Sequence, residues 1–234
     1  MKKILTIICS LLLAVSSTMN AKTLIVYYSY TNSCHDIVQT LTSLIEADVL
    51  RIEPADKTQK YEANNYAVGM QLLEAINDSP NDAASYPAID PICITDLTSY
   101  QTIIIVTPLW WSQMATIMQT YLFHHGGEMT GKNVGLIVSS ASSGISGVVS
   151  DCQRLVPNGK YFSENLWINN SNRSNRSTLI QNWLTAVNYD AVTAIETPAT
   201  RNTATASYYS ISGMRLSQAP KYGIFIVDGK KIIK

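Results

Sequence analysis

Three short segments of the sequence combine residue types that can bind a phosphate group or a flat aromatic ring. The first is Ser29-Tyr30-Thr31-Asn32-Ser33-Cys34, which is rich in hydroxyl and amide side chains. At a helix N-terminus such a loop suits a phosphate, because free N–H groups and the helix dipole favour negative charge. The alternative is that the same side chains only cap the helix.

The second segment is Thr107–Met114, which contains Trp110 and Trp111 in succession. Neighbouring side chains of an extended segment point in opposite directions, so the two rings cannot both face one core. We expect one indole to stand free to stack on a planar ligand. Packing of both rings against helices is the alternative.

The third segment, Ser139–Gly147, consists of serine, alanine and glycine apart from one isoleucine. Small residues let the backbone approach the edge of a ligand and donate N–H groups to it. By itself the segment is equally compatible with an ordinary flexible loop. Because the three segments contain no Asp, Glu or Lys, we expect no catalytic acid–base pair there, and any reaction would depend on a bound cofactor.

Alternating apolar and amphipathic stretches predict the elements that position these segments. Each segment directly follows a short apolar run of the kind found in buried parallel strands. We expect five strands, over residues 23–29, 49–52, 103–106, 134–139 and 162–168. We expect helices over residues 33–46, 60–77, 114–125, 148–156 and 177–187. This order predicts right-handed βαβ units in an α/β doubly wound sheet, with any ligand at the carboxyl ends of the strands.

Taken together, the segments resemble the flavodoxin family, in particular the branch with two adjacent Trp residues in the flavin loop. The resemblance extends from Thr23 to Val187 and is carried by VYYSYTNSC, VTPLWWSQM and SSASSGISGVVSDCQRLVPN. It implies a flavodoxin-like five-stranded parallel sheet of order 2-1-3-4-5 that binds FMN. It further implies electron transfer, or reduction of an acceptor by a quinone-reductase-like enzyme, with a redox partner protein or a small molecule as partner.

The same resemblance assigns the cofactor-binding residues. The phosphate would be surrounded by Ser29, Thr31, Asn32, Ser33 and Cys34. One side of the isoalloxazine ring would be lined by Pro108, Leu109, Trp110 and Trp111. Its other edge would be lined by Ser140, Ala141, Ser142, Ser143 and Gly144.

The sequence departs from the family pattern in the phosphate loop, which commonly reads S/T-x-T-G-N-T. Asn32 stands in place of the glycine; Asn can adopt a positive φ, at a cost that Gly lacks. Cys34 stands in place of the last threonine, and a thiol at a helix N-terminus could instead be reactive, with a lowered pKa. A second interpretation therefore stays open: an exported binding module on a flavodoxin scaffold that holds no flavin.

The N-terminal 21 residues have the three parts of an export signal. Lys2 and Lys3 precede a mostly apolar run over residues 4–15, and small or polar residues follow. The run is too short for a bilayer span of about 20 residues. We expect residues 1–21 to be a signal peptide, and the mature protein to be periplasmic, extracellular or at the cell surface. No later segment reads as a transmembrane span.

The C-terminal end forms a separate module in this interpretation. We expect a flavodoxin-like domain over residues 22–188, a Thr- and Ala-rich linker over 189–207 and a small β module over 208–234. Asp228-Gly229 between two β-rich runs predicts a hairpin with a type I′ turn. This tail resembles the short C-terminal β tails of many exported Bacteroidota proteins, and it could dock on the domain or on an export or surface partner.

Composition excludes several other classes of function. Lys+Arg and Asp+Glu both number 17, and no basic stripe is present, so we expect no nucleic-acid partner. We expect no metal site at His124-His125, because adjacent side chains on a helix diverge. Asp151 and Arg154, three residues apart on a helix, are expected to form a surface ion pair.

Two further features leave alternatives open. Removal of the signal would leave Cys34, Cys93 and Cys152, an odd number, so one disulfide at most can form. Tyr61 and Tyr66 could pack over the sheet or shield a ligand, and the sequence does not distinguish these roles.

Overall fold

The computed structural model describes residues 22–91 and 96–190, together with the backbone of four short strands between residues 208 and 233. The expected signal peptide, residues 191–207 of the expected linker, and Cys93 lie outside the described residues. The chain forms two compact units, Met1–Ile195 and Glu196–Lys234.

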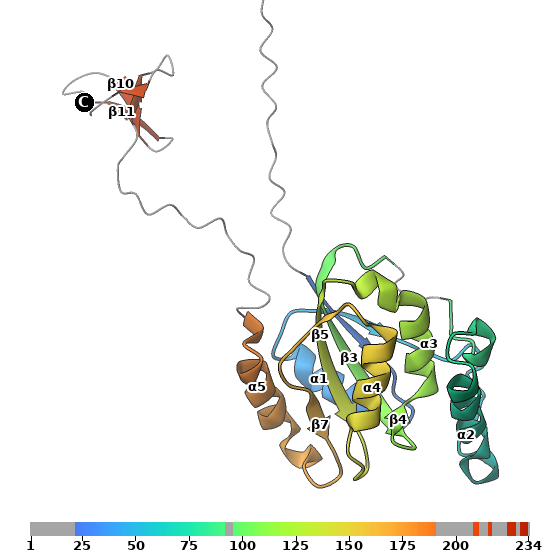
Figure 1. The fold of residues 1–234 in the computed structure, drawn as a ribbon. Helices are drawn as coiled ribbons and strands as arrows, with labels where there is room; N and C mark the ends of the chain where they lie inside the picture. Colours follow the sequence, from blue (N-terminus) through green and yellow to red (C-terminus); the bar gives the residue numbers. More distant parts are fainter. Residues whose placement is uncertain are drawn as a thin grey trace, which may run out of the picture. The chain divides into compact units, whose positions relative to one another are not determined.

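A parallel sheet forms the centre of the first unit (Figure 1). Its strands follow the order β2-β1-β3-β5, and both β6 and β7 pair with β5 at the edge. The strands are β1 (Lys22–Tyr27), β2 (Asp48–Arg51), β3 (Tyr100–Trp110), β5 (Asn133–Ser139), β6 (Lys160–Tyr161) and β7 (Leu166–Ile168). The predicted α/β doubly wound fold is confirmed. The fifth strand, expected over 162–168, is found only at its end, as β7; β6 lies just before the expected range, and the polar stretch Ser163-Glu164-Asn165 separates the two.

Helices cover both faces of this sheet, α3 and α4 on one side and α1 and α5 on the other, with α2 beyond α3 (Figure 1). The helices are α1 (Ser33–Thr42), α2 (Ala63–Asp78), α3 (Thr116–His125), α4 (Ser146–Leu155) and α5 (Arg176–Ala186). The described residues also form three short 3-10 helices, η1 (Ala83–Ser85), η2 (Gly126–Met129) and η3 (Arg173–Asn175).

The side chains of β1 show why its sequence lacks polar alternation. Leu24 and Val26 belong to the core under α3 and α4, whereas Ile25 and Tyr27 belong to the core under α1 and α5. All four are buried. A parallel strand that is covered on both faces reads as a continuous apolar run.

Several predicted boundaries differ from the observed ones, and one of these differences matters for the site. Strand β3 does not stop before Pro108 but continues to Trp110, then turns back into β4 (Gln113–Met114), with which it pairs antiparallel. Proline is tolerated here because the last pair in the β1–β3 ladder is Tyr27 with Val106. The two tryptophans therefore sit at the tip of a hairpin.

The second unit is a four-stranded antiparallel sheet of order β11-β10-β8-β9. Its strands are β8 (Tyr208–Ser210), β9 (Arg215–Leu216), β10 (Ile224–Val227) and β11 (Lys230–Ile233). Val227 pairs antiparallel with Lys230, so β10 and β11 form a hairpin, while the predicted type I′ turn at Asp228-Gly229 lies outside the described residues. Within the described part of the chain, the helices are all too short or too polar to cross a bilayer.

Candidate functional site

The three segments singled out in the sequence meet around one cavity of about 660 Å³. It lies where β1, β3, β5 and β7 end, which is where ligands bind in open α/β sheets. Predicted residues from all three segments line it: Thr31, Ser33, Pro108, Leu109, Trp110, Ser140 and Ala141.

The loop after β1 presents hydroxyl groups to the cavity at the first turn of α1. Asn32 precedes the helix with a φ of 64°, a left-handed conformation that Asn adopts more readily than most residues. Within the described residues its side chain makes no capping bond; instead the Ser29 Oγ accepts a hydrogen bond from the His35 N–H at 3.2 Å. The capping role thus falls to the buried Ser29, which leaves Thr31 and Ser33 on the cavity wall.

Cys34 is buried beneath this loop rather than facing the cavity. Its side chain is 1% exposed, and burial raises the pKa of its thiol despite a hydrogen bond from the Ser139 backbone. The alternative of a reactive thiol with a lowered pKa is therefore wrong. Cys152 is also a free and buried thiol.

The two tryptophans separate, as expected from their adjacent positions. Trp110 lines the 660 Å³ cavity and packs against Tyr28 and Tyr61, at ring-centroid distances of 5.8 and 5.0 Å. Trp111 does not line that cavity; it is 42% exposed and lies against Tyr66, in a neighbouring cavity. One indole, that of Trp110, is thus positioned beside the hydroxyl-lined loop.

The loop after β5 is held against β7 by hydrogen bonds. The Trp167 indole N–H donates to the Ser140 Oγ at 2.8 Å, and the Asn170 N–H donates to the Ala141 carbonyl at 3.1 Å. The Ser140 hydroxyl in turn donates to the Ser143 carbonyl at 2.9 Å. These bonds fix Ser140 and Ala141 on the wall. The rest of the predicted edge lies exposed beyond the cavity lining: Ser142, Ser143 and Gly144.

A fourth segment, from Ile168 to Ser177, completes the cavity and was missed by the sequence reasoning. It contributes Arg173 and Arg176, the cationic side chains in the lining. The Arg176 Nε donates to the Thr40 Oγ1 at 3.0 Å, and its guanidinium lies 3.7 Å from the Asp36 carboxylate. Its place in the sequence could have identified it, because this segment also follows a predicted strand and its residues therefore reach the same edge of the sheet.

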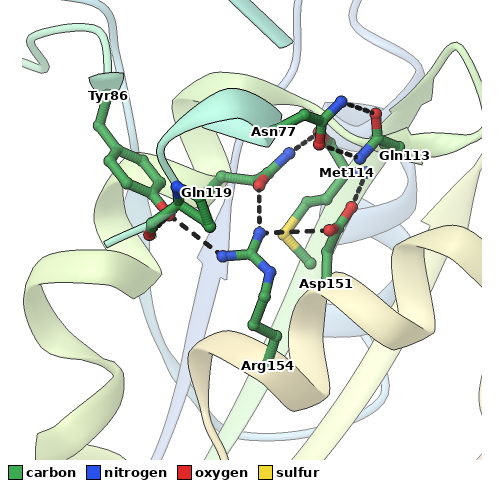
Figure 2. A network of polar contacts seen from close by, with 8 residues as sticks. Asn77, Tyr86, Gln113, Met114, Gln119, Asp151 and Arg154 are labelled. Carbon is green, nitrogen blue, oxygen red and sulfur yellow. Dashed lines mark hydrogen bonds and ion pairs between the residues drawn. The ribbon is translucent and has the colours of Figure 1, made fainter. Parts of the chain in front are cut away.

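A polar network anchors the hairpin that carries the tryptophans (Figure 2). The buried carboxylate of Asp151 accepts a hydrogen bond from the Met114 N–H at 2.9 Å and pairs with Arg154 at 3.2 Å. The side-chain amides of Asn77 and Gln113 bond reciprocally, at 3.0 and 2.9 Å. The expected surface pair Asp151–Arg154 is therefore wrong in its location, because Asp151 turns inward to bond the β4 backbone.

Gln119 and Tyr86 complete the anchor around Arg154. The Arg154 guanidinium donates to the Gln119 Oε1 at 2.8 Å and to the Tyr86 hydroxyl at 3.1 Å. The Gln119 amide donates back to the Met114 carbonyl at 2.8 Å. Both backbone groups of Met114 are thus held by side chains of α3 and α4 (Figure 2).

Comparison with known proteins agrees with this geometry. The family model described as Flavodoxin matches residues 22–187. The comparison with curated proteins gives no match.

Three solved structures show the same fold. A proposed flavoprotein from Bacteroides eggerthii is 22% identical over 72% of this chain and 99% of its own, with a TM-score of 0.54. A proposed flavoprotein from Bacteroides uniformis is 24% identical over 69% of this chain and 99% of its own, also at 0.54. A flavoprotein from Lactobacillus acidophilus, solved in complex with FMN, is 20% identical over 67% of this chain and 99% of its own, with a TM-score of 0.51. The family match spans nearly the whole first unit, and the chain belongs to the flavodoxin family.

Proposed function

We propose that the 660 Å³ cavity binds FMN and that the protein acts in electron transfer or flavin-dependent reduction. One observation carries the proposal: a hydroxyl-lined helix N-terminus, two arginines and an indole line a single cavity at the switch point of the sheet. The FMN complex of the Lactobacillus acidophilus flavoprotein, which shares the fold, supports the choice of ligand.

The residues present fit a phosphorylated aromatic ligand. The volume lies within the range of roughly 300–1,000 Å³ that is usual for small-molecule sites. Arg173 and Arg176 outnumber Asp36 in the lining, which gives the wall around α1 a net positive charge. Arginine and the first turn of a helix both favour a phosphate group.

The chain's own residues would bind and orient the ligand rather than react. Thr31 and Ser33 supply hydroxyl donors at the phosphate end, and Arg176, which is oriented by its hydrogen bond to Thr40, supplies a positive charge in the same lining. Trp110 offers a ring for stacking, and the Ser140–Ala141 backbone offers an edge. The redox chemistry is that of the flavin when bound.

Partner and location extend the same proposal. The mature protein would be exported by the N-terminal signal and would exchange electrons with a redox protein or a small-molecule acceptor. The C-terminal β module would dock on the domain or on an export or surface partner.

The proposal predicts tighter binding of FMN than of riboflavin, because only FMN has a negatively charged phosphate that Arg173 and Arg176 can attract. We expect riboflavin to bind at least about tenfold more weakly, and Arg176→Gln to reduce this preference. Glu46→Gln is a matched control, since Glu46 does not line the cavity. Quenching of flavin fluorescence measures each affinity. Equal affinities for both flavins would contradict the assigned phosphate end.

Electron transfer needs its own test. The FMN-loaded protein should be reducible by dithionite and should return its electrons to a quinone or to a redox protein, followed by flavin absorbance. A protein that does not bind FMN would instead support a binding module without flavin.

A further inference from the structure

A second cavity of about 610 Å³ also has Trp110 in its lining and is lined mostly by aromatic residues. It shares Tyr30, Thr31, Leu109 and Trp110 with the first cavity. We call its five rings the aromatic box: Tyr30, Tyr61, Tyr66, Trp110 and Trp111. Nothing in the flavodoxin assignment uses Tyr61 or Tyr66.

Most of the ring contacts in the aromatic box are edge-to-face, with large angles between the ring planes. Tyr30 meets Tyr61 at 79° and Trp110 at 90°, with centroid distances of 5.4 and 6.5 Å. Trp111 meets Trp110 at 79° and Tyr66 at 74°. The ring planes around the cavity are therefore oriented in several directions, unlike the planes of a parallel stack. Ring faces carry the negative part of the aromatic quadrupole.

The charge of the box is also negative. Among the described residues that line it, Glu62 carries the formal charge, and neither Lys nor Arg contributes to the wall. The Tyr30 hydroxyl donates a hydrogen bond to the Glu62 carboxylate. This bond lowers the pKa of Glu62, so the carboxylate stays ionised at neutral pH.

The box is open to solvent and is built at a cost in backbone strain. Tyr30, Tyr66 and Trp111 are 40, 56 and 42% exposed, although large aromatic side chains are usually covered. Tyr66 and Trp111 have φ values of 65° and 44°, which are unfavourable for bulky residues. Gly69 makes room for Trp111, because a Cβ there would lie 2.9 Å from the indole. Strain of this kind tends to persist where a ligand or a reaction requires it.

We propose that the aromatic box is a binding site for an organic cation, such as a quaternary ammonium or N-alkylpyridinium group. Several ring faces and an adjacent carboxylate attract a cation together, whereas a neutral group gains only from contact with the rings. The site shares Trp110 and part of its wall with the proposed FMN cavity but does not require flavin for its occupation. Because the two cavities share Trp110, a bound cation would lie next to the FMN cavity.

The test compares choline with its neutral isostere 3,3-dimethylbutan-1-ol on the flavin-free full chain. Calorimetry gives affinities, and upfield shifts of the choline N-methyl proton signals report contact with ring faces. We expect choline to bind at least about tenfold more tightly than the alcohol. Equal binding of both, or no upfield shift at saturating choline, would overturn the proposal.

Two variants separate charge from ring packing. Glu62→Gln should weaken choline binding by about three- to tenfold and leave the affinity for the alcohol unchanged. Glu74→Gln, on the exposed surface of α2, should change neither affinity. Gly69→Ala should displace Trp111 and weaken choline binding, although the Glu62 carboxylate is still present. Unchanged choline affinity in both Glu62→Gln and Gly69→Ala would overturn the assignment to this box. FMN quenching is read separately, so failure here leaves the flavin proposal untouched.

Discussion

Asp151, buried on α4, accepts a hydrogen bond from the backbone N–H of Met114 at 2.9 Å and so ties the tryptophan hairpin to the helix layer. Met114 pairs with Leu109 on the return strand of the hairpin that carries Trp110 and Trp111. The Asp151 carboxylate therefore helps to position a hairpin whose residues line both cavities.

Removing this carboxylate should destabilise the protein and loosen the site. Asp151→Ala leaves the Met114 N–H without its acceptor and Arg154 without its buried counter-ion. We expect a loss of about 2–3 kcal/mol in the free energy of unfolding, measured by urea denaturation. Asn77→Ala removes only an exposed amide pair and should cost under about 1 kcal/mol. Equal losses in the two variants would show that Asp151 does not anchor the hairpin.

A glycine in the first turn of α4 allows the hairpin to approach. A Cβ at Gly147 would lie 2.0 Å from the Ser112 carbonyl oxygen, so the hairpin backbone would have to move. We expect Gly147→Ala to cost about 1–3 kcal/mol and to change the tryptophan fluorescence spectrum. Gly144→Ala, which has no heavy atom within 4 Å of its new Cβ, should be neutral within about 0.5 kcal/mol. Similar behaviour of the two alanine variants would argue against this close approach.

The left-handed backbone at Asn32 predicts a graded series at the phosphate loop. Asn32→Ala should lose about 1 kcal/mol of stability, since a Cβ without a compensating amide disfavours a φ of 64°. Asn32→Gly should be tolerated and should keep FMN affinity. Urea denaturation and flavin quenching measure the two properties. Greater stability of the alanine than of the glycine variant would contradict the observed conformation.

Buried thiols predict a loss of stability at alkaline pH. Burial raises the pKa of Cys34, and it raises the pKa of Cys152 to about 12, from an ordinary value near 9.0. Above pH 9 the unfolded chain releases these protons while the folded chain retains them. Stability is therefore complete below pH 9 and falls as the pH rises toward 12, by about 1.4 kcal/mol per pH unit for each thiol.

Urea denaturation between pH 7.5 and 10.5 checks this dependence. The Cys152→Ser variant removes one of the two thiols and should show a shallower decline. A flat profile for the parent protein would contradict the burial of both thiols.

The sequence predicted the fold and three walls of the cavity because those features depend on local pattern. The run at 23–29 is apolar without alternation, which specifies a strand covered on both faces, and the segment that follows must lie at its carboxyl end. Asn32 was recognised as the residue that could adopt a positive φ, and it does so. Only one indole, that of Trp110, lines the first cavity, as expected, but the reason differs from strand alternation: β3 ends at Trp110, and Trp111 lies in the turn with a φ of 44°.

The remaining features depend on contacts between residues far apart in the chain. Arg176 reaches Asp36 and Thr40 only because α5 packs against α1, and Arg173 lines the same cavity. The inward turn of Asp151 requires the β4 hairpin, which begins after a proline that was expected to end the strand. Tyr66 can lie against Trp111 because Gly69 leaves room for the indole, whereas Tyr61 packs against Tyr30 and Trp110.

The central claim is that FMN occupies the cavity beside Trp110, and a titration of FMN fluorescence with the flavin-free full chain tests it most directly. The account predicts saturable quenching with one FMN per chain, and at least about tenfold weaker binding in Trp110→Ala, which loses the stacking ring. Trp183→Phe, remote from the cavity lining, should bind like the parent. FMN fluorescence that the parent protein leaves unchanged would contradict the account.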